Sequence, residues 1–469
     1  MLFNSYAFLF AFLPSVLLGF AAAAGRRSST PAMAFLIVAS LLFYGWWDWR
    51  CVCLLLGSLA GNFAAARWIE RVRTPGVRRA LLGGGMAANL AVLGYYKYAA
   101  FAVANLDALF GRDWTAPQVV LPLAISFFTF EQITYLVDAY HRRLPRHGLL
   151  HYATFLTFFP RLIAGPIVRP GELLPQLLAP RRAGGPLSAD AGNLATGLFI
   201  FAIGLFKKAV LADTLSPWVG PVFDSGSVPP LIDAWGAALA FTLQLYFDFS
   251  GYTDMAIGLA RMFGIRLPEN FDSPYQARSI SEFWRRWHIT LSTFLRDYLY
   301  IPLGGNRHGE WRTSANLLVT MLLGGLWHGA GWTFVLWGGW HGVLLGLERQ
   351  GRRRGLALPG PLAWGLTFTA VTVGLVLFRA PSLQRAGVML AGLVGAGGCA
   401  WDSGPYAFGA HEWKRILPLL ALVWFAPNRQ AIVAWPWRSD AAYAAAFVGL
   451  TVVAVLSLQR PVPFVYFQF

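Results

Sequence analysis

Residues 322–342 read LLGGLWHGAGWTFVLWGGWHG, and this stretch decides the fold class and where a site should be sought. Two imidazoles, His328 and His341, stand among Leu, Trp and Gly, and the sequence has no Asp, Glu, Lys or Arg from Thr313 to Leu347. An apolar run of this length is typical of a protein embedded in lipid, where an ionisable side chain is costly and indicates a function by default. The stretch therefore predicts a membrane protein with a histidine at its functional centre.

The composition of the whole chain supports the same class. Hydrophobic residues make up 56% and charged residues 13%, with a mean hydropathy of +0.51, whereas soluble domains contain about 25% charged residues. Apolar segments lie near 6–24, 32–49, 51–66, 81–104, 119–137, 193–212, 234–260, 314–347, 362–378, 386–400, 415–426 and 441–458. We expect an all-α polytopic integral membrane protein with roughly ten to thirteen membrane helices, some broken or re-entrant.

The first apolar segment and the charges indicate topology. No Lys or Arg precedes the apolar run of MLFNSYAFLFAFLPSVLLGF (1–20), so we expect an uncleaved first helix. The net charge of +16 is scattered in short clusters between apolar segments, which argues against a nucleic-acid partner and for the lipid bilayer. Cytoplasmic loops carry excess Lys and Arg, which places 67–79, 141–147 and 348–354 on the cytoplasmic side.

The sequence lacks the motifs of several kinds of site. Cys51, Cys53 and Cys399 supply neither a disulfide framework nor a zinc ligand set, and we expect all three to be small buried apolar residues. No metal site, phosphate-binding glycine loop or serine nucleophile elbow is present in the sequence. Asp248 and Asp254 adjoin apolar runs, and we expect structural pairing with Arg or backbone N–H groups.

The chain shows no linker or internal repeat, so we expect one integral domain over 1–469, with its catalytic segment at 279–347. Within the polar stretch 261–312, SISEFWRRWHITLSTFLRDYLYIPLGG (279–305) has helical periodicity, starting near Ser281 and stopping at Pro302. Its apolar, inward face carries Trp284, Trp287, His288, Leu291, Leu295 and Tyr298. Arg285, Ser292 and Arg296 share another face.

The 35 residues from Thr313 to Leu347 are long for one membrane span and short for two. Four glycines surround His328 in GGLWHGAGW (324–332), so we expect a helix break there. Non-helical backbone at membrane depth is tolerated only when it is buried in protein or lines a cavity. His328 is therefore expected to face a polar path.

Three histidines are candidates for chemistry, each with a structural alternative. A neutral imidazole at His328 suits a general base for group transfer, and the alternative is a hydrogen bond between helices. His288 has a buried position, against the alternative of an interfacial anchor. His341 shares no obvious helical face with His328, and we expect it to support the surrounding helices.

Arg285, Arg286 and Arg296 lie close to His288 in the sequence. They are typical of lipid headgroup or structural contacts. A helix with this charge is also suited to hold a phosphate-bearing cosubstrate.

Six stretches, in this order, resemble the bacterial branch of the membrane-bound O-acyltransferase family. They are SFFTFEQITYLVDAY (126–140), PRLIAGPIVRPGELLPQ (160–176), YFDFSGYTDMAIGLARMFGIRLPENFDSPY (246–275), SISEFWRRWHITLSTFLRDYLYIPLGGNR (279–307), LLGGLWHGAGWTFVLWGGWHG (322–342) and PFVYFQF (463–469). The resemblance implies helices around a tunnel that crosses the membrane, with His328 at the catalytic centre and His288 as the second functional histidine. We expect the substrate path to be lined by Trp327, Trp287, Arg285, Arg296, Asp297, Trp332 and His341.

The resemblance also implies a reaction. Acetyl-CoA would be the acyl donor, with no permanently bound cofactor, and the protein would span the bacterial inner membrane several times. A periplasmic SGNH or esterase-like partner would place the acetyl group on an exopolysaccharide such as alginate. Cellulose, another cell-surface glycan and peptidoglycan are alternative acceptors, and an acyl-group transporter or a non-catalytic scaffold is the alternative class.

Overall fold

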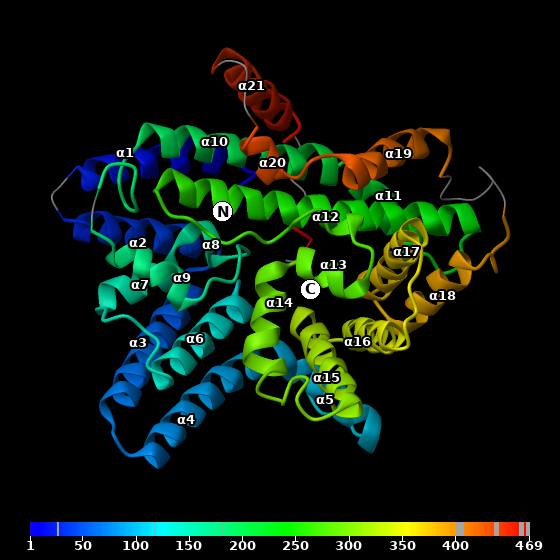
Figure 1. The fold of residues 1–469 in the computed structure, drawn as a ribbon, viewed down its shortest axis with the longest axis horizontal. Coiled ribbons are helices and arrows are strands. Elements are labelled where there is room, and N and C mark those ends of the chain that lie inside the picture. The colour runs from blue at the N-terminus through cyan, green and yellow to red at the C-terminus, as the bar shows by residue number, and fades with distance from the viewer. Residues whose placement is uncertain are drawn as a thin grey trace. The chain divides into compact units, whose positions relative to one another are not determined.

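The computed structural model shows a helical protein (Figure 1). It describes residues 1–25, 28–117, 119–180, 182–399, 408–435, 440–458 and 464–465. Within these residues the regular structure is helical and contains no strand, so the all-α prediction is confirmed. The chain divides into two compact units, Met1–Ile203 with Tyr252–Pro268, and Gly204–Gly251 with Glu269–Phe469.

The first unit is built from amino-terminal helices and the end of α12 (Leu231–Met262). Its other helices are η1 (Phe8–Phe12), α1 (Leu13–Ala24), α2 (Thr30–Gly45), α3 (Trp49–Arg71), α4 (Pro75–Leu93), η2 (Gly94–Tyr98), α5 (Ala99–Phe110), α6 (Ile125–Tyr140), α7 (Leu149–Thr157), α8 (Phe159–Leu162), α9 (Pro170–Leu178) and most of α10 (Ala191–Phe206). Local sequence explains several starts. The Asp48 side chain accepts a hydrogen bond from the Arg50 N–H and caps α3, and proline is the first residue of α4.

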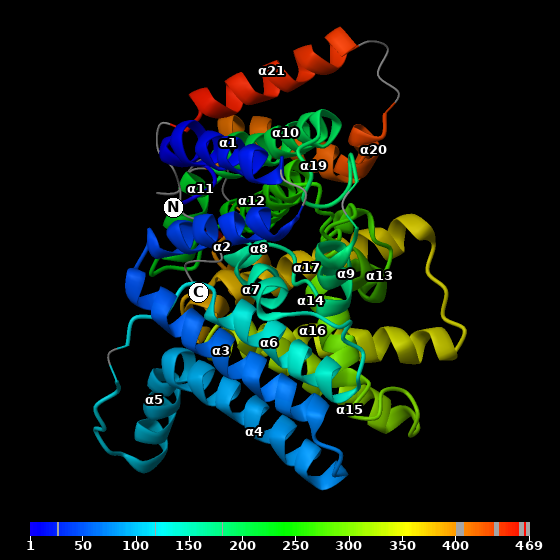
Figure 2. The same cartoon turned by 90° about the vertical axis from the view of Figure 1, so that its left-hand side faces the viewer.

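Helices α3, α4 and α6 pack together within this unit (Figure 2). Buried amides join them, because Asn62 donates to Gln132 over 3.0 Å and Asn89 donates to Asn62 over 2.7 Å. A buried ion pair between Arg161 and Glu131 connects α8 to α6, which brings two of the family-like stretches together. Because these hydrogen bonds and this ion pair are buried, they favour one pairing of the helices over others.

The second unit holds the remaining elements. These are η3 (Lys207–Ala212), α11 (Ser216–Phe223), α12 up to Gly251, η4 (Pro274–Gln276), α13 (Ile280–Arg286), α14 (Ile289–Leu295), η5 (Arg296–Tyr300), α15 (Glu310–His328), α16 (Trp332–Arg353), α17 (Gly360–Arg379), α18 (Leu383–Leu393), α19 (Ala410–Phe425), α20 (Arg429–Val433) and α21 (Asp440–Leu456). Asp248 of α12 pairs with Lys208 over 2.6 Å and accepts from the Val465 N–H over 2.8 Å. Its predicted structural pairing is confirmed.

Helices α15 and α16 form an antiparallel hairpin, and the break between them lies at Gly329–Gly331, as predicted. Glycine permits the close approach of the two helices. A Cβ atom on Gly325 would lie 2.2 Å from the Phe334 carbonyl oxygen, and one on Gly338 would lie 2.1 Å from that of Met321. The glycine pattern around His328 therefore encodes both the turn and the packing of the hairpin.

Three helices among the described residues are long and apolar enough to cross a membrane, and three shorter apolar helices accompany them. The long ones are Trp49–Arg71, Ala191–Ala212 and Gly360–Arg379, and the shorter ones are Phe8–Ala24, Thr30–Gly45 and Asp440–Leu456. All six overlap predicted apolar segments. The figure of ten to thirteen membrane helices and the central tunnel stay predictions, as does the single domain over 1–469.

The three cysteines differ in exposure. Cys51 is buried as expected, but Cys53 and Cys399 are exposed. The expectation was wrong for Cys53 because much of α3 faces away from the rest of the chain, so an apolar helical position there is not an interior one. Of the terminal stretch 463–469, only residues 464–465 belong to the described part of the chain.

Candidate active site

The helix predicted from Ser281 to Pro302 is interrupted at Trp287 and His288. Helix α13 begins after Ser279, whose hydroxyl accepts from the Glu282 N–H, and ends at Arg286. Helix α14 begins at Ile289. His288 between them has φ 42° and ψ 53°, in the left-handed region that residues other than glycine rarely adopt. The prediction of one continuous helix with its start at Ser281 was wrong.

Asn270 provides the physical reason for the interruption. Its backbone carbonyl accepts from the Ile289 N–H over 3.0 Å, and its side-chain oxygen accepts from the Thr290 N–H over 3.1 Å. The Thr290 hydroxyl donates to the same oxygen over 2.9 Å. These are the N–H groups that a new helix leaves unsatisfied at its start, so Asn270 caps α14 from a distant segment and stabilises the break.

The same Asn270 oxygen orients His288, which is fully buried. The ring Nδ1 lies 3.1 Å from this oxygen, and because the oxygen only accepts, Nδ1 carries the proton. Nε2 then presents its lone pair, and it has no hydrogen-bond partner among the described residues. Phe249 contacts the ring edge to face, with centroids 4.7 Å apart. His288 is therefore a preoriented, buried hydrogen-bond acceptor.

His328 ends α15 and lies beside His288. Their ring centroids are 6.5 Å apart, and His328 is 6% exposed. Trp327, Trp337 and Phe378 surround the His328 ring with centroids at 5.0, 5.0 and 5.3 Å. The interrupted helix and the hairpin break thus place two imidazoles together in an aromatic enclosure.

His341 is buried in the hairpin, and its supporting role stays a prediction. Its Nδ1 accepts from the Trp284 indole N–H over 3.3 Å, and it is 1% exposed. Trp337 lies between the two histidines of the hairpin, 5.1 Å from His341 and 5.0 Å from His328. His341 therefore supports Trp284 and Trp337, which form part of the enclosure around His328.

The other predicted path residues divide into buried and exposed groups. Trp327 is buried and contacts both His328 and His288, with centroids 6.3 Å apart in the second case. Trp287 is buried against Phe271 and Phe283. Arg285 and Trp332 are exposed, and Arg296 pairs with its neighbour Asp297 over 2.6 Å. The structure brings only Trp327 of this set next to both histidines, and the role of the set as a substrate path stays a prediction.

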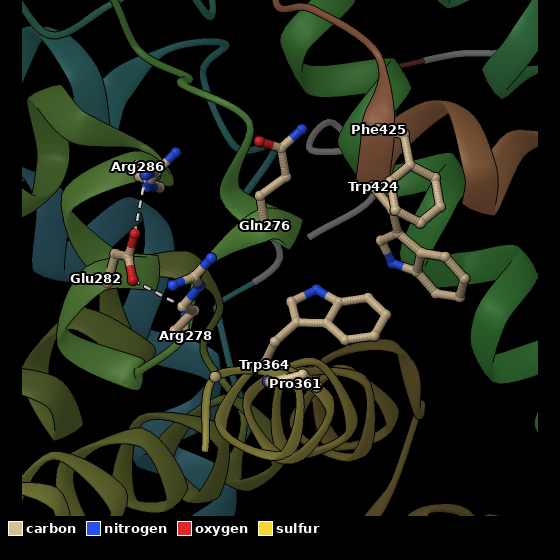
Figure 3. Close-up of a pocket in the computed structure, with 9 residues that line it drawn as sticks. Gln276, Arg278, Glu282, Arg286, Pro361, Trp364, Trp424 and Phe425 are labelled. Carbon is tan, nitrogen blue, oxygen red and sulfur yellow. Dashed lines mark hydrogen bonds and ion pairs between the residues drawn. The ribbon is translucent and has the colours of Figure 1, made fainter. Parts of the chain in front are cut away.

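A second feature of this unit is an open pocket of about 790 Å³ against the polar side of α13 (Figure 3). It is lined by Gln276, Arg278, Glu282, Arg286, Gly360, Pro361, Trp364, Trp424 and Phe425. Arg286 pairs with Glu282 over 2.9 Å, whereas the exposed guanidinium of Arg278 has no ion-pair partner in the described part of the chain. Trp364 and Trp424 meet edge to face at 5.1 Å. Cationic groups beside indole rings suit a ligand that carries both phosphate and an aromatic base.

The pocket lies at an end of α16 that was predicted to be cytoplasmic. The Ser281 N–H donates to Glu348 over 2.8 Å, and Arg352 donates to the Ser281 hydroxyl over 3.2 Å. Both partners belong to the basic segment 348–354. The start of α13, and with it the pocket, therefore adjoins the basic end of the hairpin, whose cytoplasmic location stays a prediction.

Sequence reasoning missed Asn270, Trp337 and the residues of the pocket other than Arg286. Asn270 stands in LPENFDSPY (267–275), a family-like stretch, but no local pattern indicates which side chain it contacts. Over the described ranges, no group of three or more His, Cys, Asp or Glu side chains is placed to hold a metal ion.

The burial of His288 predicts a pH dependence of stability. Burial lowers the pKa of His288 to about 3 from an ordinary value of 6.5. Between these pH values the unfolded chain binds more protons than the folded protein. The contribution of neutral His288 to the free energy of unfolding is therefore complete above pH 6.5 and is lost as the pH falls. In this range the free energy of unfolding falls by about 1.4 kcal/mol for each pH unit. His288→Gln does not titrate, so its Tm is expected to fall less steeply than that of wild type between pH 7 and 5. Parallel Tm curves would contradict this assignment.

Comparison with known proteins adds the family. The model described as the membrane-bound O-acyltransferase family matches residues 140–378. A peptidoglycan O-acetyltransferase of Helicobacter pylori is 42% identical over 428 residues, which cover 85% of this chain and 80% of that protein. A probable alginate O-acetylase of Pseudomonas aeruginosa is 44% identical over 398 residues, or 82% and 73% of the two chains. A teichoic acid D-alanyltransferase of Bacillus subtilis is 28% identical over 243 residues, or 48% and 58%.

Apolar helices of membrane-spanning length and a buried pair of imidazoles define a helical membrane protein with an enclosed polar site. The chain belongs to the membrane-bound O-acyltransferase family, as its resemblance implied, and is an O-acyltransferase.

Proposed function

We propose that this enzyme takes the acetyl group from cytoplasmic acetyl-CoA and passes it across the bacterial inner membrane for O-acetylation of an exopolysaccharide such as alginate. A periplasmic esterase-like partner would complete the transfer. The observation that carries the proposal is the buried pair of His288 and His328, held 6.5 Å apart between two helix breaks. Ten to thirteen membrane helices around a tunnel, the arrangement implied by the family resemblance, would give both sides of the membrane access to this pair.

His328 has the central chemical role in this proposal, as a general base or a transient acyl carrier. As a base, it takes the proton of the acceptor hydroxyl while the new O–C bond forms and the C–S bond of the thioester breaks. The departing thiolate then receives that proton from the imidazolium. As a carrier, its ring nitrogen bonds the acetyl carbon and releases CoA before the acceptor attacks. In either route, the Nε2 lone pair of His288 accepts a hydrogen bond from the reacting group.

The pocket beside α13 is proposed to bind the nucleotide part of the acetyl-CoA donor. Arg278 and Arg286 supply charge for phosphate oxygens, and the indoles of Trp364 and Trp424 supply surfaces for the adenine. The pocket adjoins the end of α16 that the basic segment 348–354 predicts to be cytoplasmic, which supports a donor that comes from the cytoplasm.

Arg278→Gln tests this use of the pocket. Losing one charge-assisted contact to phosphate is expected to raise KM for acetyl-CoA about tenfold with kcat unchanged, since the histidines are untouched. Arg354→Gln removes an equal charge from the neighbouring basic segment and should leave KM unchanged. Equal KM values for wild type and Arg278→Gln would exclude Arg278 from donor binding.

The relatives suggest which acceptor this enzyme uses. The relatives include proteins named for alginate and for peptidoglycan, and both match most of this chain. Alginate is the proposed acceptor, with peptidoglycan, cellulose or another cell-surface glycan as alternatives. An acyl-group transporter or scaffold is the alternative class, in which His328 would have no chemical task.

The test of the acceptor is a deletion strain complemented with wild type or His328→Ala at equal membrane abundance. O-acetyl groups are then quantified separately on exopolysaccharide and on peptidoglycan muropeptides. The proposal expects that exopolysaccharide acetylation returns with wild type only. Restoration on muropeptides instead would reassign the acceptor, and equal restoration by His328→Ala would favour the scaffold.

A further inference from the structure

We propose that the first unit binds an anionic phospholipid at the carboxyl-terminal ends of α3 and α6. Its phosphates would occupy an arginine-lined pocket, and one acyl chain would lie in a groove between α3 and α4. The site consists only of residues of the first unit and is independent of the proposed acetyl transfer.

The arginine pocket has a volume of about 800 Å³ and concentrates positive charge. It is lined by Arg67, Glu70, Arg71, Arg73, Arg142, Leu144, Pro145, Arg146 and His147. Glu70 pairs with Arg67 over 3.0 Å. The other four guanidiniums are exposed and have no ion-pair partner among the described residues. Like charges gathered around one cavity repel, so a ligand with several anionic oxygens would stabilise the pocket.

The fold holds these arginines in place. Helices α3 and α6 run in the same direction, since Asn62 and Gln132 meet along them and both helix ends reach the pocket. Arg142 follows α6 with φ 55°, a left-handed conformation that is strained for arginine. The loop is anchored by buried His147, which donates to the Pro145 carbonyl over 2.7 Å and accepts from the Tyr135 hydroxyl over 2.9 Å. The pocket is therefore preorganised.

The length of α3 places this pocket at the depth of lipid headgroups. Its 23 residues extend about 35 Å at 1.5 Å per residue, which is enough to cross a hydrocarbon layer of about 30 Å. Trp68, near the same end, is 62% exposed, as is typical of aromatic residues at a membrane interface. The two pocket segments, 67–79 and 141–147, are both cytoplasmic by their charge. Basic pockets between membrane helices on that side bind anionic headgroups.

A neighbouring groove distinguishes a lipid from a soluble phosphate compound. It has a volume of about 400 Å³ and is lined by Gly61, Ala64, Ala65, Trp68, Val77, Ala80, Leu81, Gly84 and Gly85 of α3 and α4. These residues are apolar or small, as a hydrocarbon chain requires. Trp68 of the groove directly follows Arg67 of the pocket. A phospholipid has the two chemistries needed to occupy both, whereas a soluble phosphate compound would use the pocket alone.

The test measures binding of defined probes to the full chain in detergent, by native mass spectrometry and thermal shift. The probes are cardiolipin, phosphatidylglycerol, phosphatidylcholine and inorganic pyrophosphate. We expect cardiolipin and phosphatidylglycerol to bind more tightly than phosphatidylcholine. The double variant Arg71→Gln/Arg146→Gln should lower the affinity for cardiolipin about 30-fold, because each arginine contributes about one kcal/mol to binding of an anionic lipid. Arg79→Gln/Arg354→Gln, with the same loss of charge, should have no effect.

A groove variant separates the two sources of phosphate. Gly84 lines the groove, and an added Cβ there meets no atom within 4 Å, so we expect Gly84→Leu to extend into the groove. Gly83→Leu is its matched control, because Gly83 does not line the groove and its added Cβ also meets no atom within 4 Å. Gly84→Leu alone should weaken cardiolipin at least fivefold and leave Tm unchanged. The lipid site would be overturned if phosphatidylcholine bound as tightly as cardiolipin, or if the two double arginine variants weakened cardiolipin binding equally. It would also be overturned if pyrophosphate bound and Gly84→Leu left the affinity for cardiolipin unchanged.

Discussion

Purified His328→Ala protein is expected to release CoA thiol from acetyl-CoA at about one thousandth of the wild-type rate, within the range for loss of a general acid–base group. His328 is the histidine enclosed by Trp327, Trp337 and Phe378, and it lies 6.5 Å from His288. Removing its ring leaves the donor pocket intact, so KM should change little while kcat falls. The measurement is steady-state thiol release at equal amounts of folded protein.

His341→Gln is the matched control for this loss. Glutamine retains an acceptor for the Trp284 indole N–H, and His341 has a structural environment. We expect less than a tenfold change in kcat, with a modestly lower Tm. If His341→Gln and His328→Ala lose activity to the same degree, the assignment of separate roles within the hairpin is wrong.

Asn270→Ala is expected to have the second largest effect, on both stability and rate. The substitution removes the acceptor of three buried donors, on Thr290 and His288. Each unsatisfied buried donor costs about 1–3 kcal/mol, so we expect a loss of at least about 3 kcal/mol in the free energy of unfolding. Turnover should fall about 100-fold because the ring of His288 loses its orientation. Thermal unfolding and kcat at matched temperature are the measurements.

Two further variants separate positioning from folding. Asn316→Ala removes one buried hydrogen bond, to the Gly305 carbonyl, and should cost stability without changing kcat once folded. Asn270→Asp keeps the acceptor but places a carboxylate beside His288, which favours the imidazolium form. The acid limb of its pH–rate profile should therefore move to higher pH. A wild-type profile for Asn270→Asp would show that Asn270 has only a structural role.

The local part of this site was predictable from sequence, and the non-local part was not. Four glycines around His328 predict the hairpin break, since glycine ends helices and permits close packing wherever the partner lies. The interruption at His288 has no such signal, because apolar periodicity continues across it. Its cause is Asn270, which acts from 18 residues upstream of His288. Burial of His288 was predicted correctly, although the prediction assumed one continuous helix and the structure has two.

The charge pattern of the sequence predicted which basic segments lie together but not which residues form the pocket beside α13. The basic segments 67–79 and 141–147 were assigned to one side of the membrane from sequence alone, and the structure brings both to one pocket. The pocket beside α13 was not predictable, because its rings come from α17 and α19, far from Arg278 in the chain. Arg286 was a candidate for phosphate binding from sequence, whereas Arg278, which has no ion-pair partner among the described residues, was not.

The central claim, that acetyl transfer and passage across the membrane are one event at His328, is tested most directly in sealed vesicles. Full-length protein is reconstituted with acetyl-labelled acetyl-CoA trapped on the side of the basic segments, and a periplasmic extract with polymer is added outside. The account predicts labelled O-acetyl groups outside and an equal amount of CoA thiol inside, with both absent for His328→Ala. Label released on the same side as CoA, or equal external labelling by wild type and His328→Ala, would contradict it.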